Sequence, residues 1–368
     1  MSDMVKAERQ KILSRKATKI LFVAGILLII AYFFFFQFFY NTVFYNYETG
    51  KMDSANGFAA IEQRKEIAAL FDGKLTKDTL MQMQQKLTDA KASTEGQDEN
   101  SVFSATYVYR DQAAILEHMV NGDGSMKSLH EAYPNSQSVT LGYCDGWDMM
   151  LSGMGGVLSL LMCLIVVIGL SPVFAEEYTC HTDSVICAAR YGKTKLTTAK
   201  VIASLESVIG IYTVYLILYI LLYGGFYGLG GWNVSIQSVL HYASSTYAIN
   251  FLQMFLTTVM LNILGIVALT VITLFLSAKM GSPVFALIVS CIVCFLPILF
   301  DFSDSLPILQ KAQEICPIFM LHINGVFAKM QTYLGIVQPT AMGIFNLSLI
   351  AIFYALTKGT FKQHQVTG

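Results

Sequence analysis

The sequence predicts an all-α polytopic membrane protein with six transmembrane helices, both termini in the cytoplasm, and a helical extracellular domain between the first and second spans. Three observations predict this class: six long apolar stretches, an acidic insert after the first stretch, and basic residues concentrated on one side of the spans. The 368 residues are 54% hydrophobic and 13% charged, with a mean hydropathy of +0.54. These values are typical of membrane proteins and exclude most soluble enzyme classes.

Each of the six apolar stretches has near or above the ~20 residues that a helix needs to cross the bilayer core. All six are expected to be helical, because a helix satisfies its own backbone hydrogen bonds where water is absent. The predicted spans are Ile20–Tyr40, Met150–Ala175, Val201–Tyr223, Tyr247–Ser277, Pro283–Phe302 and Gln338–Thr357.

The basic residues set the orientation of the spans. More than half of the 24 lysines and arginines lie in segments 1–19, 176–200 and 358–368 and at Lys279, which all fall on the same side of the predicted spans. The positive-inside rule places these segments, and therefore both termini, in the cytoplasm. The first span lacks a small-residue cleavage site and is longer than the apolar region of a signal peptide, so we expect it to be retained.

The opposite side receives an extracellular domain, Asn41–Met149, and two shorter segments, a Gly-rich loop at 224–246 and a linker at 303–337. The domain holds 9 basic and 16 acidic residues. An acidic face would attract cations or cationic peptides by electrostatic focusing; the alternative is the solvated surface of an outward domain. The Gly-rich loop allows a tight turn or a re-entrant hairpin before Trp232.

Apolar spacing predicts that the extracellular domain is itself helical. Apolar residues recur at helical intervals across 58–71 and again across 80–87, with Thr76 before the second run and Gly73 as a turn between the two. The polar stretch Ala92–Ser101 is expected to form a mobile loop.

No pattern of residues indicates catalysis or a metal site. Most of the 7 cysteines fall in spans or cytoplasmic segments, which argues against a disulfide scaffold. Only Cys144 and Cys316 fall outside together, either as a disulfide or as two thiols. The six histidines are scattered, and no catalytic or metal-binding motif appears. We therefore expect no catalytic residue, no metal ligand and no nucleic-acid site.

The cytoplasmic segment between the second and third spans, Glu176–Lys200, is the most informative part of the chain. Its first part, Thr182–Arg190, can wind as an amphipathic helix that ends at Gly192, and a second short helix, Thr194–Lys200, leads into the third span. Two short helices beneath a membrane domain form a surface for a soluble partner. The alternative is an ordinary charged loop anchored at the lipid headgroups.

This segment also carries a recognisable pattern. An acidic pair is followed by Thr-Asp, apolar residues and then Arg-x-Gly-Lys-x-Lys-Leu-x-x-Ala-Lys. The pattern, its place between spans two and three of six, and the large domain after the first span resemble the membrane subunit of ABC-2-type exporters, in the branch that includes sodium, drug and antimicrobial-peptide exporters. The family often has Gly where this chain has His181. The resemblance implies that seven residues contact or orient an ATPase: Glu176, Glu177, Asp183, Arg190, Tyr191, Lys193 and Lys195.

The chain itself is not expected to hydrolyse ATP. The tripeptide Gly192-Lys193-Thr194 has the end of a P-loop, but Cys187 stands where that motif needs its first Gly. We expect no cofactor on this chain, with ATP and Mg²⁺ bound by a separate nucleotide-binding ATPase subunit. The resemblance further implies a second permease copy or a paralogue as partner, surrounding membrane lipid, and a bacterial inner membrane.

Polar residues inside the spans are candidates for a transport pathway or gate, because a charge at the bilayer centre costs ~2.5–3.5 kcal/mol on insertion scales. Glu206 lies near the cytoplasmic edge of the third span and is a candidate for gating, or for pairing with a basic residue. Asn262 in the fourth span and Asn346 in the sixth would line a pathway or form interhelical hydrogen bonds.

Two functions from different classes follow. The favoured one is the permease subunit of an ATP-driven ABC exporter that moves a hydrophobic or amphipathic solute, peptide or lipid outward. The alternative is a membrane sensor or scaffold whose extracellular domain binds a ligand without transport. A P-loop protein bound to the segment 176–200 would distinguish the two.

Overall fold

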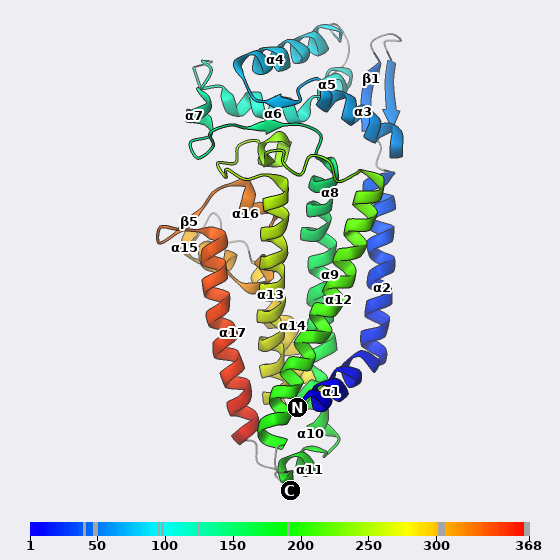
Figure 1. The fold of residues 1–368 in the computed structure, drawn as a ribbon, viewed down its shortest axis with the longest axis vertical. Coiled ribbons are helices and arrows are strands. Elements are labelled where there is room, and N and C mark those ends of the chain that lie inside the picture. The colour runs from blue at the N-terminus through cyan, green and yellow to red at the C-terminus, as the bar shows by residue number, and fades with distance from the viewer. Residues whose placement is uncertain are drawn as a thin grey trace.

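The computed structural model is mostly helical and describes residues 1–39, 42–46, 51–94, 96, 99–123, 125–189, 192–300 and 306–363. Long helices run side by side, a domain that we call the head sits at one end, and short helices lie at the other end beside the N-terminus (Figure 1). We call the latter the basic end. Five helical stretches are long and apolar enough to cross a membrane: Lys16–Phe38, Asp145–Thr179, Thr194–Phe226, Phe251–Lys279 and Gln338–Lys362.

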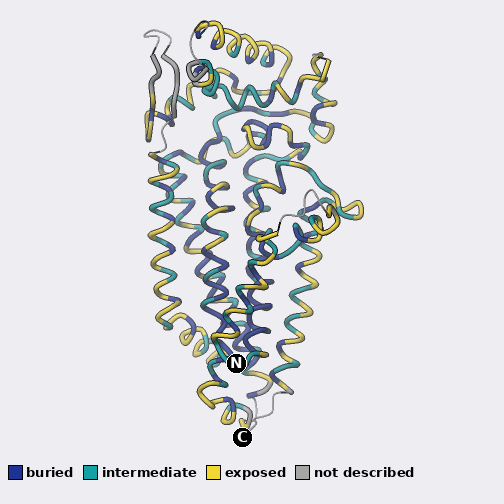
Figure 2. Tube along the Cα trace, turned by 180° about the vertical axis from the view of Figure 1, so that it is seen from behind, coloured by how far each residue is buried: buried dark blue, intermediate teal, exposed yellow. Residues whose placement is uncertain are grey.

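The bundle has a buried centre and exposed edges. The second and fourth predicted spans are mostly buried within the protein, whereas the residues of the first and last are mostly exposed or half-buried, as the colours of Figure 2 show. Most exposed side chains along the middle of these edge helices are apolar, which suits contact with lipid. The bundle elements are α2 (Lys16–Tyr32), η1 (Phe33–Phe38), α8 (Asp145–Gly153), η2 (Met154–Leu158), α9 (Ser159–Leu170), α12 (Thr197–Phe226), α13 (Phe251–Lys279), α14 (Pro283–Leu299) and α17 (Gln338–Gln363).

Tyrosines on one face of α12 fasten it to its neighbours. Tyr215 lies against Gly25 of α2, where any larger side chain would collide with its ring, and its hydroxyl donates to the Phe22 carbonyl oxygen at 3.0 Å. The Tyr219 hydroxyl donates to the Gly153 carbonyl oxygen at 3.0 Å. Both rings are fully buried. These hydrogen bonds satisfy polar groups in an apolar surrounding, where an unmet bond is costly.

The fifth predicted span differs from the other five. Pro283–Phe302 was expected to cross the bilayer, but the helix α14 ends at Leu299 and has 17 residues. At 1.5 Å per residue it is ~25 Å long, less than the ~30 Å of a bilayer core. The described residues therefore contain five clear candidate spans and a shorter apolar helix, and the sixth span stays a prediction.

The chain after α14 turns back into the bundle. Its elements are α15 (Pro307–Glu314), η6 (Pro317–Met320) and α16 (Asn324–Ala328), which we call the returning segment. η6 packs on the middle of α13, because Gly265 has no side chain to hold Pro317 and Met320 away. The sequence placed 303–337 in an outer linker and a candidate re-entrant turn in 224–246, whereas the structure puts the re-entrant packing in the linker.

Two buried asparagines donate hydrogen bonds to backbone carbonyl oxygens of the returning segment. The Asn262 amide fits with its nitrogen donating to the Met320 carbonyl oxygen at 2.7 Å and its oxygen accepting from the Tyr212 hydroxyl at 3.3 Å. The Asn346 amide nitrogen donates to the Ile315 carbonyl oxygen at 2.9 Å. Irregular backbone at this depth is tolerated only where protein groups supply its hydrogen bonds. Both asparagines are thus positioned as interhelical hydrogen-bonding groups.

The head contains the two predicted helices. α3 spans Gly57–Ala69, and α4 spans Lys77–Ala92 with the Thr76 side chain accepting from the Thr79 backbone N–H at 3.2 Å. The expected loop Ala92–Ser101 is interrupted by α5, which begins at Glu99, and residues 95, 97 and 98 lie outside the described residues. The other head elements are β1 (Thr42–Asn46), β2 (Lys51–Ala55), β3 (Gly73–Lys74), α5 (Glu99–Tyr107), α6 (Arg110–Met119), α7 (Leu129–Ala132) and β4 (Thr140–Leu141).

The head has a small apolar core of its own and rests on the loop that follows α12. Its core includes Phe71, Met83 and Ile115. The Tyr133 hydroxyl donates to the Ala243 carbonyl oxygen at 2.8 Å, and the Asp111 carboxylate accepts from the Leu240 backbone N–H at 2.9 Å. The loop 227–250 therefore forms the floor of the head.

Candidate functional site

A kinked helix brings acidic residues to the basic end. α9 gives way to α10 (Pro172–Thr179) at Pro172, which has no N–H to donate to the preceding turn. The Ser277 hydroxyl of α13 compensates: it accepts from the backbone N–H groups of Phe174 at 3.0 Å and Ala175 at 3.2 Å and donates to the Ser171 carbonyl oxygen at 2.6 Å. The kink is thereby fixed to α13 and aims α10 across the end of the bundle.

A buried ion cluster lies between α10 and the start of α12. The Lys200 side chain is 0% exposed, and its ammonium lies 2.5 Å from a Glu177 carboxylate oxygen and 3.5 Å from a Glu8 carboxylate oxygen. It also donates to the Val173 carbonyl oxygen at 2.9 Å. Glu177 is 4% exposed and has Lys11 as a second partner at 3.7 Å. Buried charges persist only when paired in this way.

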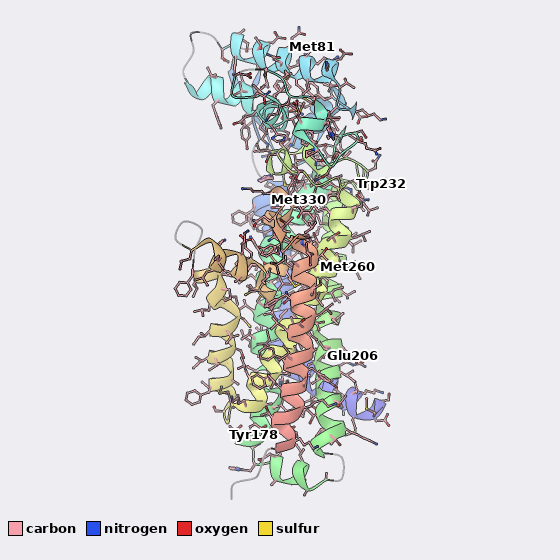
Figure 3. All side chains as sticks on the ribbon, turned by 90° about the vertical axis from the view of Figure 1, so that its left-hand side faces the viewer. Met81, Tyr178, Glu206, Trp232, Met260 and Met330 are labelled. Carbon is pink, nitrogen blue, oxygen red and sulfur yellow. The ribbon has the colours of Figure 1, made fainter. Side chains whose placement is uncertain are left out.

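The N-terminal segment supplies most of the partners. Residues Ser2–Ser14 form a helix, α1, that packs on α12 and is separated from α2 by extended backbone at Arg15. Arg15 donates to a Glu176 carboxylate oxygen at 2.6 Å and to the Gly169 carbonyl oxygen at 3.2 Å. Arg9 donates to a Glu206 carboxylate oxygen at 3.1 Å, and Figure 3 shows Glu206 on α12 where α1 crosses it. α1 therefore ties the ends of three spans together.

A short helix projects beyond this cluster. α11 (Asp183–Ala188) lies farthest from the head, and its Val185 side chain is 73% exposed (Figure 1). The turn from α10 to α11 passes through His181 at φ 55, the left-handed conformation that glycine favours. His181 thus adopts a conformation that glycine would adopt without strain. Ile186 of the same helix packs inward on the bundle.

The second predicted short helix, Thr194–Lys200, is not separate. The chain runs from η3 (Gly192–Leu196) directly into α12. Gly192 approaches the Ile186 carbonyl so closely that a side chain there would overlap it. The glycine therefore closes the turn between α11 and the third span rather than only ending a helix.

The structure divides the seven residues expected to meet an ATPase. Glu177 and Asp183 are buried, and Glu176 is engaged with Arg15. Lys195 is exposed, and Lys193 lies in η3. Arg190 and Tyr191 lie outside the described residues. The outward face of α11 is defined by Val185 and its exposed neighbours Thr182, Ser184, Ala188 and Ala189, and it lies on the amphipathic helix that the sequence predicted.

The candidates for a pathway or gate lie in different surroundings, and Glu206 lines a groove at the basic end. Glu206 is about half exposed and pairs with Arg9 at the bundle end, while Asn262 and Asn346 are buried against the returning segment. Arg9 and Glu206 are 197 residues apart, so no local sequence pattern could have predicted that they pair. The amphipathic spacing of α1, with Ile12 buried, was a signal that could have revealed that helix.

A second ion cluster joins the head to the bundle. The Arg64 guanidinium of α3 lies 3.1 Å from an Asp145 carboxylate oxygen of α8 and 3.7 Å from an Asp111 carboxylate oxygen of α6. Burial alone would lower the pKa of Arg64, but the two carboxylates raise it above its ordinary value. Beside the cluster lies a cavity of about 340 Å³, whose lining includes Arg110 and His241.

Six cysteines whose side chains the structure describes are free thiols: Cys144, Cys163, Cys180, Cys291, Cys294 and Cys316. Cys144 is buried where the head meets α8, and Cys316 lies in the returning segment, so the two do not form a disulfide. Burial raises the pKa of the Cys144 thiol. No group of His, Cys, Asp and Glu side chains in the described residues is arranged to hold a metal ion.

Comparison with protein-family models, with curated proteins and with solved structures gives no match to this chain.

Proposed function

We propose that this chain is the permease subunit of an ATP-driven ABC exporter of the ABC-2 type, powered by a separate nucleotide-binding subunit. The carrying observation is the exposed face of α11, which follows α10 in the chain and packs through Ile186 on Gly192 at the start of the third span. The Lys200 cluster joins α10 to α12 beside it. A force applied to α11 would reach α10, α12 and α1 through short, buried contacts. Coupling between sites needs such contiguous packed elements.

In this proposal the basic end faces the cytoplasm and the head lies outside. The basic residues of α1 and α12 support this orientation through the positive-inside rule. The protein acts in a bacterial inner membrane beside a second permease copy or paralogue, and α14 serves as a further, shorter span. The cargo is a hydrophobic or amphipathic solute, peptide or lipid, and ATP and Mg²⁺ bind only the partner ATPase.

The test is affinity purification of the full chain from its native membrane in mild detergent, with identification of bound proteins and an assay of ATP hydrolysis. We expect a P-loop ATPase to be recovered, and Val185→Glu to release it because a charge replaces an apolar contact. Ala7→Glu adds the same charge to the exposed side of α1, and it should retain the ATPase. A chain that purifies alone under several detergents would contradict the proposal.

A membrane sensor is the second candidate, and the cavity beneath the head favours it. The cavity of about 340 Å³ combines polar groups, Arg110, Gln63 and His241, with the apolar Phe36 and Met149. A pocket of this size and mixed lining can hold a small ligand. A sensor would bind its ligand there without any ATPase attached, so ligand-dependent stabilisation of a chain that purifies alone would favour this function.

A further inference from the structure

A groove of about 590 Å³ opens at the basic end between α1, α2 and α12. Its floor is apolar and includes Phe22 of α2 and Ile211 and Val214 of α12. Gly210 leaves the floor open, because no atom outside α12 lies within 4 Å of the place where its side chain would stand. The volume falls within the range of ~300–1,000 Å³ that is typical of small-ligand sites.

The polarity of the groove changes along its length. The mouth of the groove carries Arg9 of α1 and Lys19 near the start of α2. Its floor reaches Val214, which lies eight residues after Glu206 along α12. At 1.5 Å per residue this is ~12 Å toward the middle of the span. A charged rim at the end of a span and an apolar floor deeper in the bilayer match the order of a phosphate and an acyl chain in a phospholipid.

The two basic groups at the rim are available to an anion. Lys19 is exposed, and within the described residues no carboxylate pairs with it. Arg9 pairs with Glu206 at 3.1 Å, but both side chains are almost half exposed. Exposed pairs of this kind contribute only ~0–1 kcal/mol, so a phosphate can share or replace the carboxylate. A guanidinium binds phosphate through two parallel hydrogen bonds.

We propose that this groove binds an anionic phospholipid from the leaflet at the basic end, with its phosphate at Arg9 and Lys19 and an acyl chain along Phe22, Ile211 and Val214. A neutral lipid would gain the apolar contacts without the charge, and a free phosphate would gain the charge without the contacts. The site does not depend on transport, so it stands whether or not an ATPase binds α11.

Occupancy of the groove changes the contacts of α1. A phosphate held by Arg9 releases Glu206, while Arg15 and Lys11 continue to hold α1 to α10. The lipid therefore bridges α1 to α2 and α12 at the point where the Arg9–Glu206 pair held α1 to α12, while Glu8 and Lys200 still join α1 to α12. The composition of the leaflet would in this way act on the same helix that joins the ends of the spans.

The test is native mass spectrometry of the full-length chain, purified in mild detergent and delipidated, during titration with phosphatidylglycerol. Phosphatidylcholine with the same acyl chains and glycerol phosphate serve as the neutral-lipid and soluble-anion probes. Two matched pairs of variants locate the site: Lys19→Gln against Lys16→Gln for the rim, and Val214→Trp against Val23→Trp for the floor. Lys16 and Val23 are exposed on α2 and do not line the groove.

We expect phosphatidylglycerol to bind more tightly than phosphatidylcholine, and glycerol phosphate not to bind. Lys19→Gln should weaken phosphatidylglycerol binding about fivefold, since one basic residue at an anionic lipid surface contributes ~1 kcal/mol. Val214→Trp should fill the floor and weaken binding as well, whereas Lys16→Gln and Val23→Trp should match the parent. All four positions are exposed or line the groove, so folding can be checked by an unchanged elution profile.

Three results would overturn the proposal. Equal affinity for the charged and neutral lipids would remove the role of the rim. Binding of glycerol phosphate as tight as that of the lipid would indicate a site for a soluble anion. A change of oligomeric state in Val214→Trp with unchanged lipid binding would show that a second copy of the chain, and not lipid, covers the groove.

Discussion

Replacing Lys200 by methionine should destabilise the protein strongly, because the ammonium is fully buried between two carboxylates. Its loss leaves Glu177, 4% exposed, with only the half-exposed Lys11 at 3.7 Å as a cationic partner. Removing one partner of a buried pair costs ~3–5 kcal/mol. We expect about 3 kcal/mol, the lower end, since Lys11 can move toward the orphaned carboxylate. The Val173 carbonyl also loses its donor at 2.9 Å.

A double-mutant cycle separates the ion pair from simple packing. Glu177→Met removes the other charge, and the double variant Lys200→Met/Glu177→Met leaves neither charge buried alone. The loss of unfolding free energy in the double variant should therefore be smaller than the sum of the two single losses by at least ~2 kcal/mol. Equilibrium unfolding in mixed micelles with increasing sodium dodecyl sulfate measures the free energies. Additive losses, or a Lys200→Met variant as stable as the parent, would refute the reasoning.

Four further predictions concern single contacts. Ser277→Ala should lower stability by about 1–3 kcal/mol, because it leaves two buried N–H groups at the α10 kink unpaired; an unchanged unfolding midpoint would show that another group replaces the hydroxyl. Gly265→Leu should push the returning segment off α13 and cost ~1–3 kcal/mol, seen as a lower thermal midpoint unless the helices can separate freely. His181→Gly should be neutral or stabilising and His181→Val destabilising, since β-branched residues disfavour positive φ; the reverse order of midpoints would contradict the turn. In single-cysteine variants, Cys180 should react with maleimide at pH 8 in the folded protein, while Cys144 should not because burial raises the pKa of its thiol; rapid labelling of Cys144 would show that the head opens.

Hydropathy and helical spacing were enough to predict most of the architecture from the sequence. The five long spans and the helices α3 and α4 of the head were predictable because each is amphipathic or apolar over its whole length. The shorter α14 was predicted too long, although the local sequence carries two signals of an early end: Pro297 inside the helix and the acidic Asp301 directly after Phe300.

The returning segment and the ion clusters could not be predicted in the same way. η6 enters the bundle because Gly265, Asn262 and Asn346 accept it, and these lie on two helices far apart in the chain. The sequence placed Glu177 and Lys200 in a cytoplasmic segment and Glu177 at an ATPase contact, since charge alone does not show whether a side chain is paired and buried. Burial of that pair follows from the Pro172 kink and from α1 covering the end of the bundle.

The measurement that tests the central claim most directly is photo-crosslinking from the exposed face of α11 in native membranes. A benzophenone amino acid at position 185 should form an adduct with one protein whose peptides contain a Walker motif, and the adduct should change in yield with a nonhydrolysable ATP analogue. The same amino acid at position 7, on the exposed side of α1, should not form that adduct. Crosslinking only to lipid, or to proteins without a P-loop, would contradict the assignment of this chain as a permease driven by a separate ATPase.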